Sequence, residues 1–433
     1  MNNSVISKKI PITDLLSSII DNRGKTVPTA SNGFPLIATN CVLNERLFPI
    51  FDNIRYVSQE TLKTWFRAHL EPNDILFVNK GTPGRCCLVP NPVSFCVAQD
   101  MIGLRCDSKK VYYRYLLMAL RSPAIQKTIK NNHVGLVIPH FKKENLSTLL
   151  IPLPDMSEQI FLGDLYYNIS LKIEENNTIC SELESIAKLL YDYWFVQFDF
   201  PDENGKPYKS SGGKMVWNET LKRPIPDGWV VSRIGDLISS ERGISYSTPN
   251  ISTGKGIPML NLASFRPGTG EYKSEGLKHF LGVYPENKKL NPYDLILCNT
   301  QQTAIKFETD IIGRAMLVPD IFENDIVFSH HVNVIHTVNN ELKFYLLYLF
   351  NSDYFHKYIS GFTNGTNILG LTFSGVENFH VEIPKENVLN EFSSIILNIA
   401  KQKSLIIKEN QQLASLRDFL LPMLMNGQVK IKP

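Results

Sequence analysis

Residues 157–196 read SEQIFLGDLYYNISLKIEENNTICSELESIAKLLYDYWFV, and this stretch decides the architecture of the chain. Its apolar side chains recur at alternating spacings of four and three residues, the pattern of a helix that packs along a seam. Such a helix is about 60 Å long at 1.5 Å per residue. A second stretch repeats every seam position at one constant offset, which relates Leu165 to Ile395. The two sets of seam positions are Leu165, Ile169, Lys172, Asn176, Ile179, Leu183, Ile186, Leu190 and Tyr193, and Ile395, Ile399, Gln402, Ile406, Glu409, Leu413, Leu416, Leu420 and Met423.

Two long seams in one chain predict that the helices pack against each other in antiparallel orientation, as a coiled coil. Polar seam residues such as Asn176 and Glu409 cost stability but fix the register of the pair. The alternative is two unrelated amphipathic helices, each lying on its own domain.

The regions before the two helices also match each other, so the repeating unit is a domain plus a helix. The offset of about 220 residues far exceeds the 20 to 50 residues of solenoid repeats. The order of the landmarks is kept while their spacing drifts, which indicates a duplicated domain with an internal pseudo-two-fold repeat. The matching segments are Ile12–Leu16 with Ile234–Ile238, Leu70–Leu76 with Leu290–Ile296, Gly84–Pro90 with Gly313–Pro319, and Ile151–Pro152 with Ile383–Pro384.

Each repeated domain reads as a mixture of strands and helices, which gives an α+β fold class with two mixed α/β domains. We expect domains at residues 1–155 and 231–388, helices at 156–198 and 389–433, and an exposed connector at 199–230 that is rich in Pro, Gly and Ser. The expected strands are Asp74–Val78, Cys87–Val89, Ile102–Leu104, Asp294–Leu297 and Val332–Ile335, and the expected helices are Tyr112–Leu120 and Lys343–Phe350.

Charge is divided unevenly along the chain. Residues 1–150 hold 19 Lys and Arg against 10 Asp and Glu, a net charge of +9, whereas residues 231–384 hold 12 against 15, a net charge of −3. The basic first domain fits a polyanion partner such as DNA.

No apolar run reaches the roughly 18 residues of a membrane helix, and no secretory signal pattern opens the chain. The seven scattered cysteines fit free thiols in a reducing cytoplasm.

Several motifs of the chain have the form of a known family. They are Leu190–Pro201, Gly205–Gly213 and Ile225–Trp229, together with Ile138–Phe141 leading to Ile151–Pro154, and the Gly81–Arg85 turn. Through these motifs the chain resembles type I restriction-modification specificity subunits. Members of that family consist of two target-recognition domains held apart by two antiparallel helices. The resemblance covers essentially the whole chain.

The resemblance implies a subunit of a bacterial or archaeal cell without catalytic activity of its own. It would read a bipartite, asymmetric double-stranded DNA target, one half per domain, with a spacer set by the paired helices. The helices would also dock two methyltransferase subunits, through which restriction subunits join. S-adenosylmethionine and ATP would belong to these partners. The alternatives are a specificity subunit of a methylation-only assembly, a stand-alone nuclease or methyltransferase, and a coiled-coil scaffold without DNA binding.

Motifs for catalysis are missing. The chain has no GxxxxGK[ST] phosphate loop, which an ATP-driven motor needs. The nearest string to an adenine methyltransferase motif is Asn291-Pro292-Tyr293-Asp294, and its repeat partner Glu71–Asp74 lacks both the Asn and the aromatic residue. We therefore interpret both as a turn that enters a strand. His330 and His331 lack an acidic or Cys partner at ligand spacing, so no metal site is expected.

Candidate DNA contacts are polar and basic residues in predicted loops, because Arg and Lys bind guanine or phosphate, and Asn and Gln bind adenine. Arg85 matches Arg314 across the repeat, which favours a phosphate-binding or structural role. Gln301 and Gln302 are the preferred adenine readers of the second domain. The candidates are Arg23, Lys25, Lys80, Thr82, Arg85, His133, His140, Lys142 and Lys143 in the first domain, and Ser245, Gln301, Gln302, Thr303, Lys306, Asn364 and Asn367 in the second.

Overall fold

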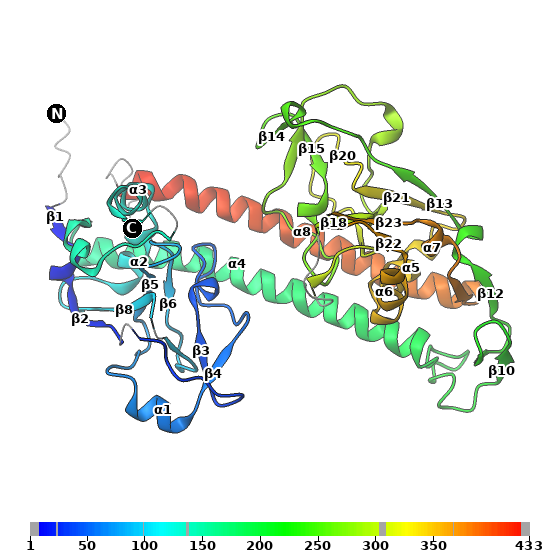
Figure 1. The fold of residues 1–433 in the computed structure, drawn as a ribbon, viewed down its shortest axis with the longest axis horizontal. Helices are drawn as coiled ribbons and strands as arrows, with labels where there is room; N and C mark the ends of the chain where they lie inside the picture. Colours follow the sequence, from blue (N-terminus) through cyan, green and yellow to red (C-terminus); the bar gives the residue numbers. More distant parts are fainter. Residues whose placement is uncertain are drawn as a thin grey trace. The chain divides into compact units, whose positions relative to one another are not determined.

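A computed structural model of the chain describes residues 8–22, 25–97, 99–135, 138–302, 309–366 and 368–425. It divides into two compact units (Figure 1). Unit 1 comprises residues 1–178 and 409–433, and unit 2 comprises residues 179–408. The chain passes from one unit to the other within a helix at Thr178 and at Lys408, two positions related by the same offset as Leu165 and Ile395. The division itself therefore follows the repeat.

Unit 1 is built on two small sheets. One is antiparallel with strand order β2-β8-β5-β6, and the other has order β4-β3-β7 with β3 and β7 parallel. The first strand, β1, pairs with the last, β9. The elements are β1 Lys8–Pro11, β2 Leu16–Ile20, β3 Phe34–Ile37, β4 Arg55–Val57, α1 Gln59–Thr64, β5 Ile75–Val78, β6 Cys86–Leu88, β7 Cys96–Val97, β8 Met101–Cys106, α2 Tyr113–Arg121, α3 Pro123–Asn132 and β9 Leu150–Leu153.

Unit 2 repeats this topology with the same order of strands. The sheet β13-β21-β17-β19 corresponds to β2-β8-β5-β6, and β24 pairs with β12 as β9 pairs with β1. The elements are β12 Val230–Arg233, β13 Ile238–Arg242, β14 Ile251–Ser252, β15 Ile257–Leu260, β16 Lys278–Phe280, β17 Leu295–Cys298, β18 Thr300–Gln302, β19 Ala315–Leu317, β20 Val327–Phe328, β21 Val332–Thr337, α5 Leu342–Asn351, α6 Asp353–Ile359, β22 Thr363–Asn364, β23 Ile368–Leu371, α7 Ser374–Glu377 and β24 His380–Ile383. The duplicated domain and the expected strands and helices are confirmed.

We call β5 and β17 the central strands of the two units. The turn that precedes the central strand is the same in both units. Asp74 accepts a hydrogen bond from the Glu71 N–H at 2.7 Å before β5, and Asp294 accepts one from the Asn291 N–H at 2.7 Å before β17. The intervening residues Asn73 and Tyr293 both have positive φ, 72° and 67°. The interpretation of these strings as strand-entering turns is confirmed.

The long helices are α4, Met156–Tyr191, and α8, Glu386–Met425 (Figure 1). Asp155 caps α4, because its carboxylate accepts the Glu158 N–H at 2.9 Å. A π-helical turn, Asp192–Val196, follows α4. Among the described residues, no helix has both the length and the apolar character needed to cross a membrane.

The two helices contact each other through polar side chains within both units. In unit 1, the Asn176 amide donates to Glu409 at 2.7 Å and to Asn410 at 2.8 Å, and the Asn410 amide donates to Asn177 at 3.1 Å. In unit 2, Lys403 pairs with Glu184. The contacts advance along α4 while they move back along α8, so the helices are antiparallel as expected.

The expected seam is out of phase by one residue along much of α4, although Asn176 and Ile399 are buried as expected. The line of buried residues on α4 runs through Tyr166, Ser170, Ile173, Ala187 and Tyr191, each one position after an expected seam residue. Ile179, Ile186 and Leu416 are exposed, whereas Ile399 is buried. The other expected apolar positions are half-buried, namely Leu165, Ile169, Leu183, Leu190, Ile395, Ile406, Leu413 and Leu420. Small and polar residues line part of the interface, so apolar spacing alone gave the wrong phase.

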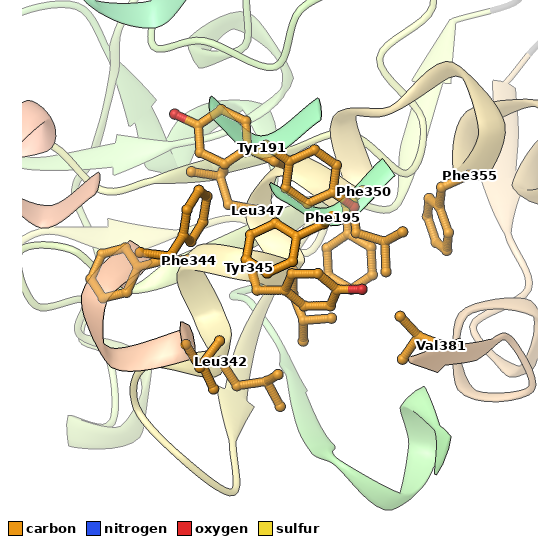
Figure 2. Close-up of a cluster of buried hydrophobic side chains, with 14 of the residues drawn as sticks. Tyr191, Phe195, Leu342, Phe344, Tyr345, Leu347, Phe350, Phe355 and Val381 are labelled. Carbon is orange, nitrogen blue, oxygen red and sulfur yellow. The ribbon is translucent and has the colours of Figure 1, made fainter. Parts of the chain in front are cut away.

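The core of unit 2 joins both helices to the domain (Figure 2). Tyr191 and Phe195 lie against Tyr345 of α5, with ring centroids 5.8 and 4.9 Å away. Phe392 of α8 lies edge-on to Phe195 at 4.7 Å. Buried aromatic pairs of this kind stabilise a core beyond the area they bury.

Part of the connector belongs to this core, which corrects the expectation of an exposed segment. Phe200, Ile225 and Trp229 are buried, and the Phe200 ring stacks on Trp229 at 5.2 Å. Strands β10, Met215–Asn218, and β11, Arg223–Pro226, form a hairpin within the connector. The buried aromatic residues fix this part of the connector in the core, although its Pro, Gly and Ser content predicted an exposed segment.

Candidate nucleic-acid interface

The turn that follows β5 presents candidate residues of the first domain. Gly81 and Gly84 have φ of 87° and 95°, conformations that other residues rarely adopt, so the sharp turn requires glycine. The side chains of Lys80 and Thr82 are exposed, and Arg85 is half-buried. The turn therefore offers a cation and a hydroxyl to solvent.

A second segment pairs with this turn. The N–H groups and carbonyls of Val134 and His140 bond to each other at 2.8 and 2.7 Å, and His140 forms a β-bridge with Lys80. The Gly81 N–H donates to the Pro139 carbonyl at 2.8 Å. The structure thus brings Lys80, Thr82 and His140 together, although they are widely separated in sequence. His133, at the start of this segment, is half-buried.

An exposed lysine, Lys143, contacts a third segment of the first domain. Lys143 Nζ lies 3.1 Å from Asp21 Oδ2, and Lys142 precedes it with an exposed side chain. Lys25, a little further along the chain than Asp21, is also exposed. Arg23 lies outside the described residues. Three of the predicted segments therefore converge on one part of unit 1, and they carry more cations than carboxylates.

The matched arginines have different surroundings. Arg314 is 3% exposed, and its guanidinium donates to the Asn351 carbonyl at the end of α5 and lies 4.0 Å from Asp353. Arg314 thus has a structural role, whereas the role of half-buried Arg85 stays a prediction.

In the second domain the corresponding turn is replaced by a sheet. Thr300, Gln301 and Gln302 form β18, which pairs with β23, and β23 pairs with β22. Thr300 pairs with Gly370, as Lys80 pairs with His140 in the first domain. The two pairings show that Gly370 occupies the position of His140.

The structure does not support Gln301 as an adenine reader. Its side chain is 3% exposed, and its Oε1 accepts the N–H groups of Ile311 and Ile312 at 2.9 and 3.1 Å. A side chain used in this way holds the chain that returns toward β19, and its burial is inconsistent with a direct base contact. Only the backbone of Gln302 is described, within β18, and Thr303, Lys306 and Asn367 lie outside the described residues.

The other candidates of the second domain are on the surface. Asn364 of β22 is exposed, and its amide donates to Thr372 at 2.8 Å. Ser245 is exposed and precedes Tyr246, whose ring lies 5.3 Å from that of His330. Within the described part of the chain, no group of three His, Cys, Asp or Glu side chains is arranged to hold a metal ion.

Two residues that the structure places beside Lys80 and Thr300 were not among the candidate DNA contacts, Asp100 and His331. Each directly precedes the strand paired with the central strand, and each carbonyl accepts a hydrogen bond from an equivalent asparagine N–H: Asn79 to Asp100 and Asn299 to His331, both at 3.0 Å. Their side chains reach the neighbouring residue, Lys80 or Thr300. A systematic alignment of the two repeats, which sets the apolar run of β8 against that of β21, would have found the pair.

Comparisons with known proteins agree with this architecture. Residues 7–184 and 226–415 each match the family described as type I restriction modification DNA specificity domain. The chain is 23% identical to the type I restriction enzyme MjaIX specificity subunit of Methanocaldococcus jannaschii, over 92% of this chain and 87% of that protein. It is 21% identical to the HindI specificity subunit of Haemophilus influenzae, over 92% and 95%.

A crystal structure of a type I restriction-modification S subunit from M. genitalium has a similar fold. The TM-score is 0.56 at 14% sequence identity, and the match covers 98% of this chain and 97% of that one. The two family matches span most of the sequence and coincide with the two repeats of domain and helix. The chain therefore belongs to the type I restriction-modification DNA specificity family and is a non-catalytic specificity subunit whose two domains recognise the halves of a DNA target.

Proposed function

We propose that residues 1–155 and 231–388 are two target-recognition domains, and that each reads one half of a bipartite, asymmetric double-stranded DNA target. An unread spacer separates the two halves, and the paired helices set its length. The observation that carries this proposal is a repeated scaffold with divergent loops. Strand order and the turn before the central strand are kept, whereas the residues after that strand differ. Loops on a rigid scaffold are where recognition residues concentrate.

In the first domain, Lys80, Lys142 and Thr82 are proposed to contact the DNA. Their exposed positions on converging segments suit phosphate and base-edge contacts. Two lysines bound to phosphates release counterions, which makes binding depend on salt. In the second domain, exposed Asn364 and Ser245 are the remaining candidates with a described side chain.

The helices are proposed to dock two methyltransferase subunits, one on each of two equivalent apolar patches. We define patch A as Ile186 and Leu189 on α4 and patch B as Leu416 and Phe419 on α8. Patch A belongs to unit 2 and patch B to unit 1, and their residues match at the constant offset of the helix repeat. Leu189 is 67% exposed and Phe419 is 63% exposed. Exposed apolar residues that are grouped on one helix face are typical of protein interfaces.

The chemistry of modification and cleavage is assigned to partner subunits. The methyltransferase subunits would bind S-adenosylmethionine, and restriction subunits that join through them would use ATP. A methylation-only assembly would need the same DNA-reading and docking surfaces, so the proposal for this chain is the same in both cases.

The proposed phosphate contacts predict a change in salt dependence. In the complex with methyltransferase subunits, Lys80→Ala combined with Lys142→Ala should weaken DNA binding and reduce the slope of log affinity against log salt by about 2, close to one unit per lost phosphate contact. The charge-matched control is Lys9→Ala with Lys109→Ala, two exposed lysines of the same unit. Equal slopes for the two double variants, measured by fluorescence anisotropy, would exclude the proposed contacts.

The division of the target predicts the outcome of a domain exchange. Replacing residues 12–150 by the corresponding segment of a relative with a different target should change one half-site and leave the other half-site unchanged. Methylome sequencing of cells that carry the hybrid gives both half-sites at once. A change in both halves contradicts the division of labour.

The two patches predict a stepwise loss of partners. Leu189→Glu in patch A or Phe419→Glu in patch B should reduce the number of bound methyltransferase subunits from two to one, and the double variant should bind none, because a buried unpaired carboxylate opposes association. Native mass spectrometry counts the subunits. Val283→Glu, at an apolar residue that is 99% exposed on unit 2, serves as the control and should retain two. Retention of both subunits by the double variant would refute docking at these patches.

A further inference from the structure

The two domains share a frame of hydrogen bonds directly after the central strand. The Asn79 N–H donates to Asp100, and the Asn79 carbonyl accepts from the Phe141 N–H at 2.7 Å. In unit 2, the Asn299 N–H donates to His331, and the Asn299 carbonyl accepts from the Leu371 N–H at 2.8 Å. The same two backbone bonds thus hold the same residue type in both domains.

The asparagine side chains extend the similarity. The Oδ1 atoms of both Asn79 and Asn299 are buried and have no hydrogen-bond partner in the described part of the chain. A buried acceptor without a partner costs about 1 to 3 kcal/mol and is uncommon in folded proteins. The same acceptor therefore lacks a protein partner at the equivalent position of both domains.

The side chains that the frame presents are different in the two domains. In the first, Lys80 Nζ lies 3.5 Å from Asp100 Oδ1, and both groups reach solvent, with side chains 45% and 33% exposed. In the second, Thr300 Oγ1 lies 2.7 Å from His331 Nδ1. One position therefore carries an ion pair and the other a hydroxyl and an imidazole.

The surroundings of His331 define what it can offer. Burial, together with nearby His330 and Arg242, lowers its pKa to about 4, so the ring is neutral near pH 7. Because Nδ1 forms a hydrogen bond with Thr300, Nε2 is the ring nitrogen that can contact another molecule. The His330 ring is 3.9 Å away and the Tyr246 ring is 6.3 Å away, which restricts the orientation of the imidazole.

We propose that Asp100 and His331, which occupy equivalent positions in the two frames, determine base specificity in their half-sites. Lys80 orients Asp100, and Thr300, which is 8% exposed, orients His331. The Asp100 carboxylate accepts from an amino group such as cytosine N4. His331 offers one neutral ring nitrogen and no formal charge. Two domains that read different bases on one scaffold must differ where the scaffold meets the bases, and this pair differs within an otherwise matching frame.

The inference rests on the proposed division of the target, and conservative variants test it. Asp100→Asn and His331→Asn keep the backbone carbonyls of the frame and change only side-chain chemistry. Each has a control near the other end of the same strand. Asp107→Asn breaks an ion pair of similar distance, 3.3 Å to Lys110, and His336→Asn changes an exposed histidine of β21.

Methylome sequencing of cells that express each variant with its methyltransferase subunits gives the result. Asp100→Asn is expected to relax or switch the accepted base at one position of one half-site, by about tenfold or more in relative methylation, and His331→Asn to do so in the other half-site. Both controls keep the parental target. An unchanged target for both variants at full methylation overturns the inference, and so do changes that fall in the same half-site.

Two further measurements distinguish a wrong assignment of these residues from misfolding of a variant and from a wrong division of the target. Should Asp100→Asn not accumulate as folded protein, Lys80→Gln replaces it, because that side chain is exposed and the frame does not depend on it. The exchange of residues 12–150 is carried out in the same strain. If the exchange alters one half-site while the variants alter none, the division of the target stands and the assignment of these residues is wrong.

Discussion

The antiparallel contact between α4 and α8 is the constraint on which the rest of the structure depends. Asn176 is 1% exposed, and within the described part of the chain its amide N–H groups donate to Glu409 and Asn410 of the other helix. Sliding one helix along the other by a turn would leave this buried amide unpaired, which costs about 1 to 3 kcal/mol. A buried polar group of this kind fixes a register that apolar contacts alone would tolerate in several forms.

Each domain is held to its helix at the same position, which carries the register of the helices to the domains. Glu174 of α4 accepts the Leu47 N–H at 2.7 Å and pairs with Arg46 at 2.8 Å. Ser404 of α8, the residue that matches Glu174 in the helix repeat, accepts the Asp320 N–H at 3.1 Å. The helices keep a constant offset because both take part in the same antiparallel contact, whereas the loops of the domains are free to diverge.

The sequence predicted the duplication, the main strands and the antiparallel helices, because these depend on periodicity and on repeated turn chemistry. It did not give the phase of the whole seam, since Ile186 and Leu416 look like core residues until the fold shows that they are exposed. Hydrophobicity cannot distinguish a residue that packs internally from one that faces a partner. In the candidate interface, exposed Lys80 was predictable from its turn, whereas Gln301 was misjudged because its burial depends on distant backbone groups. Asp100 and His331 were not among the candidates because the apolar runs that follow them were not aligned with each other across the repeat.

The central claim is that the paired helices set the distance between the two half-sites, and a matched change of helix length tests it most directly. One heptad inserted after Thr178 and one after Lys408 keeps the seam nearly in phase and lengthens each helix by about 10 Å. Methylome sequencing should then show the same two half-sites with a spacer longer by about three base pairs, at roughly 3.4 Å per pair. A heptad inserted at Gly205 in the connector is the control and should not change the spacer. An unchanged spacer in a fully methylating variant with both helices lengthened would contradict the account.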